Sequence, residues 1–229
     1  MIVSHKHRFI FLRTEKTAGS SIEFALAELC GPEDIVTGIN SEAAARLGLT
    51  PGAGRPRWTR RLSIRTGGLR RALPQYFGIH THASAAEVRQ FLPRHVFGSY
   101  FKFAVERNPW DRQVSLYYER AGRQARPADF SRDMSSLIYR KFHYTKLRNW
   151  QAYTINDQIV VDELIRFESL AEGLANVAAK LGLPNAIELG KRRSGSRPSL
   201  PYRDLYTSKT KHLIENWYRN EIDAFGYQF

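Results

Sequence analysis

The sequence has almost no cysteine, no long apolar run and few acidic residues for its number of basic ones. Cys30 is the one cysteine among 229 residues, so no internal disulfide forms and a reducing, cytoplasmic location is expected. No stretch approaches the roughly 20 apolar residues of a membrane span. The apolar run near the N-terminus is too short for a signal peptide. We therefore expect a soluble protein with neither a membrane span nor a signal peptide.

Basic residues are abundant: 35 lysines and arginines against 22 acidic residues give a formal net charge of +13. Such an excess predicts an anionic partner, which is a phosphate, a sulfate, a polyanionic sugar or a nucleic acid. Seven arginines and no acidic residue lie at 51–74, among glycines and prolines. This part, around residues 50–75, is predicted to be an insertion loop, either a solvated surface or an acceptor-binding segment. The length fits a single domain over residues 1–229.

Strands and helices are predicted to alternate along the chain. Ser84 and Glu87 form a capping box before one helix, and Asn108 and Pro109 suit the cap and first position of another. The alternation favours an α/β fold with a central, largely parallel sheet. Apolar runs predict strands at 8–13, 100–107 and 159–161, and the spacing of apolar residues predicts helices at 21–29, after 84, after 108, at 170–181 and within 205–229.

The stretch RTEKTAGSS, residues 13–21, joins the first predicted strand to the first predicted helix. Ligands of parallel sheets bind beyond the carboxyl ends of the strands, where a helix N-terminus offers amides and a positive dipole end to an anion. Small residues allow close approach, hydroxyls add donors and a lysine adds charge. An ordinary helix cap with a surface lysine is the alternative explanation of the same residues. The stretch is not a Walker A loop, because the motif GxxxxGK[ST] is absent. The candidate anion-binding residues are Lys16, Thr17, Ala18, Gly19, Ser20 and Ser21.

A second candidate segment, RNPWDRQVSLYY, begins at Arg107. An arginine at the end of a strand suits bidentate contacts with a phosphate, and Ser115 lies two turns into the helix that follows. Both residues also have ordinary explanations. Arg107 can pair with a carboxylate, and Ser115 can be a plain helix residue.

Together these segments resemble the PAPS-dependent sulfotransferases, in particular the branch that contains many carbohydrate sulfotransferases and their bacterial relatives. Residues 16–21 are similar to that family's KTAGTS-like segment, and residues 101–117 are similar to its FxFxVRNPWDRxVSxY segment. Ser20 stands where threonine is usual, and Glu106 is inserted before the arginine. RFESL and DAFGYQF later in the chain extend the resemblance, whereas the arginine-rich insertion and residues 120–148 match nothing in the family.

The resemblance implies a P-loop-like three-layer fold with helices on both sides of the sheet. It also implies that the donor is PAPS (3′-phosphoadenosine 5′-phosphosulfate) and that the product is PAP. Lys16 would stabilise the charge on the departing PAP, while Arg107 and Ser115 would hold the 3′-phosphate. The expected acceptor is a hydroxyl group of a carbohydrate, including an anionic carbohydrate. A lipid or another small hydroxylated metabolite is the open alternative. No nucleic-acid partner is expected.

An acceptor hydroxyl needs a base, and GIHTHASAAE offers His80 and His82. We rank His82 first, because a position just outside a helix N-terminus disfavours imidazolium and keeps the ring able to accept a proton. A surface or structural role is the plain alternative for either histidine. The HxH pair has no evident further ligands, so we predict that the protein requires no metal.

Two other functions compete with sulfuryl transfer. A P-loop kinase or NTPase agrees with the anion-binding geometry and with IVVD, which ends at Asp162 and loosely resembles a Walker B strand. A nucleic-acid-binding module rests on the net charge and the arginine runs. Magnesium dependence of nucleotide binding distinguishes the first alternative, and steep salt dependence of duplex binding distinguishes the second.

Overall fold

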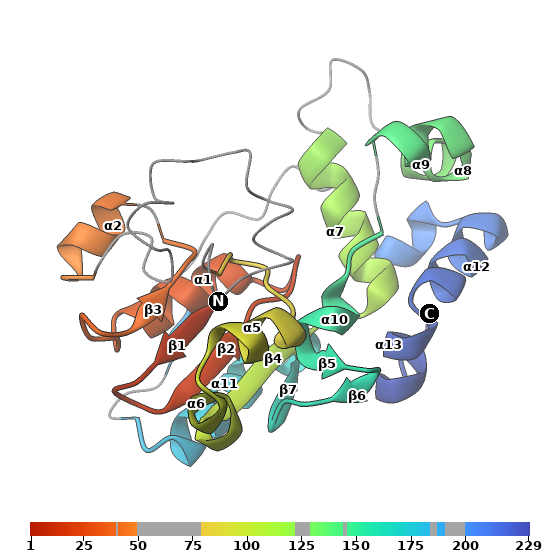
Figure 1. The fold of residues 1–229 in the computed structure, drawn as a ribbon. Coiled ribbons are helices and arrows are strands. Elements are labelled where there is room, and N and C mark those ends of the chain that lie inside the picture. The colour runs from red at the N-terminus through yellow and green to blue at the C-terminus, as the bar shows by residue number, and fades with distance from the viewer. Residues whose placement is uncertain (40, 50–78, 122–128, 144–145, 184–186, 191–199) are drawn as a thin grey trace. The chain divides into compact units, whose positions relative to one another are not determined.

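The described residues form two compact units, which are considered separately. The first comprises Met1–Glu106 with Asn149–Gly190, and the second comprises Arg107–Arg148 with Lys191–Phe229. The predicted insertion loop around 50–75 lies outside the described residues, and the single domain stays a prediction. The computed structural model (Figure 1) describes residues 1–39, 41–49, 79–121, 129–143, 146–183, 187–190 and 200–229.

A five-stranded sheet in the order β3-β1-β2-β4-β7 forms the centre of the first unit. Strands β2, β4 and β7 are parallel, whereas β1 is antiparallel to both β2 and β3. The predicted α/β fold with a largely parallel sheet is therefore confirmed. The strand bounds are Ile2–Ser4 for β1, Phe9–Leu12 for β2, Ile35–Val36 for β3, Phe101–Glu106 for β4 and Glu163–Arg166 for β7.

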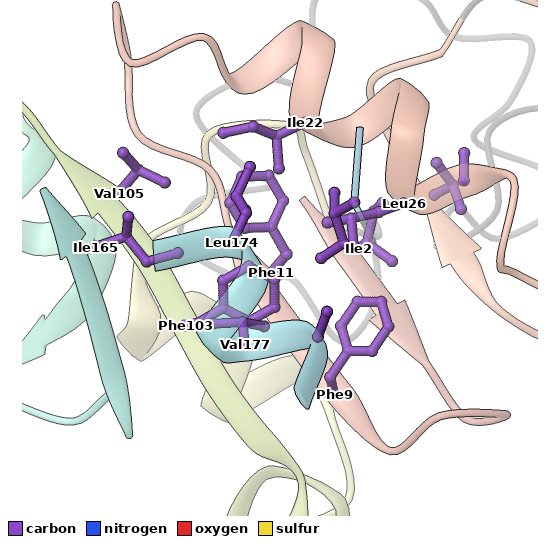
Figure 2. Close-up of a cluster of buried hydrophobic side chains, with 14 of the residues drawn as sticks. Ile2, Phe9, Phe11, Ile22, Leu26, Phe103, Val105, Ile165, Leu174 and Val177 are labelled. Carbon is purple, nitrogen blue, oxygen red and sulfur yellow. The ribbon is translucent and has the colours of Figure 1, made fainter. Parts of the chain in front are cut away.

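Helices cover both faces of this sheet, which gives the expected three layers (Figure 1). On one face, Ile22 and Leu26 of α1 and Leu174 of α11 pack with Phe11 and Phe103 of the strands (Figure 2). Burial of each such side chain contributes about 1.5–3 kcal/mol. Helices α5, α6 and α10 lie on the opposite face. The helix bounds are Gly19–Ala27 for α1, Ser41–Arg46 for α2, Ala85–Phe91 for α5, Arg94–Ser99 for α6, Asn149–Tyr153 for α10 and Leu170–Lys180 for α11.

The described part of the second unit is helical. Its core contains Trp110, Tyr117 and Tyr218, and the buried Arg112 pairs with the buried Glu221 at 3.2 Å. No helix in the described parts of the chain has the length and apolar character that crossing a membrane requires. The helix bounds are Pro109–Ala121 for α7, Phe130–Ser135 for α8, Leu137–His143 for α9, Ser208–Trp217 for α12 and Arg219–Phe225 for α13, and a 3-10 turn covers Tyr202–Leu205.

Most predicted elements form where the sequence pattern placed them, but the strand at 159–161 is wrong. Only Gln158–Ile159 is extended there, as β6, and it pairs with β5 (Thr154–Ile155) in a two-stranded hairpin. Asn156 and Asp157 both have positive φ angles, 51° and 60°, which suits the tight turn of a hairpin. The strand that joins the main sheet is β7, a few residues later. At the C-terminus the predicted helix is two helices, which meet at Tyr218.

Candidate active site

The loop between β2 and α1, residues 13–18, has a backbone conformation that side chains seldom adopt. Lys16 and Ala18 lie in the left-handed region, with φ angles of 64° and 59°. Helix α1 begins at Gly19 with Ala18 at its N-cap, and no side-chain hydrogen bond caps this helix. The alternative of an ordinary Ser or Thr cap is therefore wrong. A helix start without a side-chain cap directs backbone N–H groups toward the surface at the carboxyl end of the sheet.

Two threonines hold the β2–α1 loop against the sheet. The Thr14 hydroxyl donates to the carbonyl of Val105 in β4, and the Thr17 hydroxyl lies 2.7 Å from that of Thr14. Both threonines are buried. The Thr17 hydroxyl therefore fixes the shape of the loop, whereas Ser20 is exposed and Ser21 is half-buried at the start of α1.

Arg13 contributes to this loop in a way that the sequence did not suggest. Its guanidinium donates to the Ser20 hydroxyl at 2.6 Å and pairs with the buried carboxylate of Glu23. Its side chain crosses Gly19, where a β-carbon would lie only 2.8 Å from the Arg13 Cγ. A residue without a β-carbon is therefore needed at position 19 to make room for the Arg13 side chain, whether or not a ligand is bound. The acidic residue Glu23, about one helical turn after Gly19 and Ser20, was the signal in the sequence that could have indicated a partner for Arg13.

The structure brings His82 to the same loop. Its Nδ1 lies 3.4 Å from the carbonyl oxygen of Arg13. Because a carbonyl only accepts, Nδ1 carries the hydrogen and Nε2 of the neutral ring carries the lone pair. Neighbouring groups desolvate the ring and the charge of Arg13 lies close, so the pKa of His82 falls from 6.5 to about 4, although the residue as a whole is exposed. The ring is thus neutral near pH 7.

Both ring nitrogens of His80 lie near protein groups, but only Nδ1 has a hydrogen-bond partner among the described residues. The backbone N–H of His82 donates to its Nδ1 at 3.2 Å, and its Nε2 faces the Glu87 carboxylate at 3.5 Å. Glu87 in turn completes the predicted capping box with Ser84 at the start of α5, which is confirmed. His82 stays the first candidate base because its ring contacts the β2–α1 loop, and His80 stays the second, a prediction.

The second candidate segment lies at the start of α7. Asn108 caps the helix, since its side-chain oxygen accepts from the Trp110 N–H at 3.0 Å, and Pro109 is the first helical residue, as predicted. The Arg107 guanidinium donates twice to one oxygen of Asp111, at 2.8 and 2.6 Å. Asp111 and Ser115 are four residues apart and share a face of the helix. The carboxylate pairing weighed for Arg107 is thus present, and it fixes the direction of a guanidinium that has five N–H donors.

Asp162 does not have the position of a Walker B aspartate. Such a residue lies at the carboxyl end of a strand, beside the phosphates, whereas Asp162 precedes β7. Its carboxylate pairs with Lys102 at 2.9 Å, near the amino end of β4. Asp162, the feature that favoured a kinase, therefore lies near the amino ends of the parallel strands, whereas the β2–α1 loop lies at a carboxyl end.

The chain is similar to known proteins in sequence. Residues 1–228 match a family model described as the sulfotransferase family. An uncharacterised protein of Archaeoglobus fulgidus is 31% identical over 107 residues, which are 44% of this chain and 84% of that protein. No solved structure matches the chain. The family match includes both candidate segments and nearly the whole length.

Proposed function

Because the chain belongs to the sulfotransferase family, we propose that this PAPS-dependent sulfotransferase transfers the sulfuryl group to a hydroxyl of a carbohydrate. The net charge of +13 supports an anionic sugar as acceptor, since a basic surface attracts it and raises its local concentration. The single cysteine supports a cytoplasmic enzyme.

The observation that carries the proposal is the joint presence of the left-handed Lys16 loop and the neutral His82 in the first unit. The loop ends in a helix N-terminus without a side-chain cap, which suits the charged phosphosulfate end of the donor. His82 contacts the backbone of the same loop through Arg13. The β2–α1 loop thus carries the cation Lys16 and contacts the proton acceptor His82.

The proposed reaction is a direct displacement. His82 Nε2 takes the proton from the acceptor hydroxyl as its oxygen forms a bond to sulfur, and the bond between sulfur and the 5′-phosphate oxygen breaks. Lys16 stabilises the negative charge that develops on the departing PAP. Sulfuryl transfer, like phosphoryl transfer, has a loose transition state, so positioning and charge are the main contributions of the protein.

We further propose that Arg107 and Ser115 bind the 3′-phosphate. Arginine suits bidentate contacts with phosphate, and Asp111 holds the guanidinium in one orientation. Lys16, Thr17, Ala18, Gly19, Ser20 and Ser21 are proposed for the phosphosulfate end, with backbone amides and the Lys16 ammonium as the main donors.

Calorimetric titration with PAP and with ATP, first in EDTA and then in magnesium, tests the donor site. We expect micromolar PAP binding that does not need the metal and weaker binding of ATP. Incubation with ³⁵S-labelled PAPS and a panel of neutral and anionic oligosaccharides then tests the acceptor. Labelling of lipids or small phenols in place of sugars would contradict the carbohydrate proposal, and magnesium-dependent ATP binding without PAP binding would contradict the donor site.

A further inference from the structure

The short helix α10 carries two buried polar side chains on one face. Asn149 and Tyr153 are four residues apart, and their exposures are 2% and 0%. Neither belongs to a segment that the sequence singled out. A buried amide and a buried phenol need hydrogen-bond partners, so the partners show what the helix holds in place.

Asn149 binds the residue directly before Lys16. Its Oδ1 accepts from the backbone N–H of Glu15 at 2.9 Å, and its Nδ2 donates to the carbonyl of the same residue at 3.0 Å. One side-chain amide thus satisfies both backbone groups of Glu15, as a neighbouring strand would. Since Lys16 follows with a φ of 64°, this pair of bonds fixes the direction in which the chain enters the left-handed turn.

Tyr153 binds the end of the neighbouring strand. Its hydroxyl donates to the carboxylate of Glu106, the last residue of β4, at 2.8 Å, and both side chains are fully buried. The Thr14 hydroxyl reaches the same strand one residue earlier, at the Val105 carbonyl. Helix α10 is therefore fixed to β4 by one side chain and holds the loop after β2 by another.

We propose that Asn149 is a positioning residue for the reaction, which acts by holding Lys16 where the leaving group forms. The proposal rests on the proposed function, in particular on the role of Lys16. The chemistry requires an amide at this position, because the site needs one donor and one acceptor at fixed places. The substitution Asn149→Asp would keep the acceptor and lose the donor, and Asn149→Leu would lose both.

The test is a double-mutant cycle on the full-length protein, with initial rates of ³⁵S transfer from PAPS and calorimetric affinity for PAP. Asn149→Leu is expected to lower kcat about 100-fold, as for a slightly misplaced catalytic group. Its affinity for PAP should fall less than about tenfold, because Lys16 is one of several donors to the 5′-phosphate in the proposed site. In the Lys16→Ala background, the same change should cost less than about threefold further, since nothing remains to be positioned.

Thr154→Val is the matched control. Thr154 is also buried and donates to the Trp150 carbonyl at 2.7 Å, so its loss disturbs α10 without touching the β2–α1 loop. It should lower the melting temperature and leave kcat unchanged. If Asn149→Leu does not fold, Asn149→Asp replaces it, because aspartate keeps the size and one of the two hydrogen bonds.

Three results would overturn the positioning role: an unchanged kcat in the Asn149 variant, losses that multiply in the double variant, or a fall in kcat that Thr154→Val reproduces. A different result marks failure of the proposed function itself. In that case Lys16→Ala alone keeps full turnover, whatever the Asn149 variant does.

Discussion

The chain leaves the parallel strands β2 and β4 in different ways, although both lead directly into a helix. After β2 the backbone turns through the left-handed Lys16 and Ala18, and α1 begins without a side-chain cap. After β4 the side chain of Asn108 caps α7, and Pro109 begins the helix in an ordinary conformation. We call these connections the first and the second joint. They differ in the helix cap: no side chain caps α1, whereas a side chain caps α7.

This difference indicates how each joint would bind the anion that we propose for it. At the first joint the amides of α1 have no competing side-chain cap, and one lysine adds charge. At the second joint a side chain caps the helix, and an arginine held by Asp111 is the charged group. Changes at Lys16 should therefore affect the transfer step, whereas changes at Arg107 should affect donor affinity.

The largest expected effect is that of Lys16→Ala. It should lower kcat about 10²–10³-fold, the usual loss when one group that stabilises developing charge is removed. Affinity for PAP should change less than about tenfold. Initial rates at saturating PAPS measure this, with Lys6→Ala as the control, because Lys6 is exposed and donates to the Leu29 carbonyl. Equal losses in both variants would refute the role of Lys16.

Arg107→Ala should instead weaken PAP binding about 10–100-fold, since hydrogen bonds to a charged group contribute about 1.5–3 kcal/mol. The kcat at saturating PAPS should fall much less. Calorimetry with PAP measures the affinity. Arg219→Ala, an exposed arginine of the same unit that contacts Asn216, should bind PAP normally. A change in kcat without a change in PAP affinity would contradict the role of Arg107 in donor binding.

The pH profile examines His82 beside the first joint. With a pKa of about 4, its ring loses the ability to accept a proton only in strong acid. We expect kcat/KM to stay level from neutral pH down to about pH 5 and to halve near pH 4. Because the pKa is lower in the folded chain, the unfolded chain takes up the proton first, so stability should decline as pH falls from about 6.5 to 4. An acid limb near pH 6.5 in an intact protein would mean that another group is the base.

Asn108→Ala should lower the free energy of unfolding by about 1 kcal/mol through loss of the α7 cap. Urea denaturation measures the change. Asn108→Asp keeps the oxygen that accepts from Trp110 and should retain most of the stability. If both variants lose the same amount, the cap is not the source of the effect.

Ala18→Gly should have the smallest effect and the opposite sign. Glycine adopts a φ of 59° without the steric cost of a β-carbon, so the free energy of unfolding should rise by about 0.5–1 kcal/mol. Ala25→Gly, within the right-handed turns of α1, should lower it by a similar amount. A loss of stability in Ala18→Gly would show that the backbone there is not strained.

Local signals predicted the second joint better than the first. The Asn-Pro pair and the capping box of Ser84 act within four residues, so the starts of α7 and α5 follow from the sequence. The left-handed residues do not, because the contacts that impose them, such as Thr14 with Val105, join positions 91 residues apart. The sequence does not indicate the role of Asn149 for the same reason, since its partner Glu15 is 134 residues away.

Sequence patterns also did not predict the two antiparallel strands β1 and β3. Strands β1 and β3 contain three and two residues, too few to show an alternating period. The candidate residues at both joints were predicted from their position at the ends of strands together with the resemblance to sulfotransferases. The structure added contacts that hold them: Arg13 over Gly19 and Asp111 against Arg107.

The buried bond between Glu106 and Tyr153 has a consequence for how this enzyme can evolve. A buried carboxylate that loses its hydroxyl partner is costly, and so is a buried phenol that loses its acceptor. The two positions should therefore change together. Related chains with an apolar residue in place of Glu106 should carry phenylalanine or another apolar residue in place of Tyr153, and a chain with only one of the two changes should be less stable.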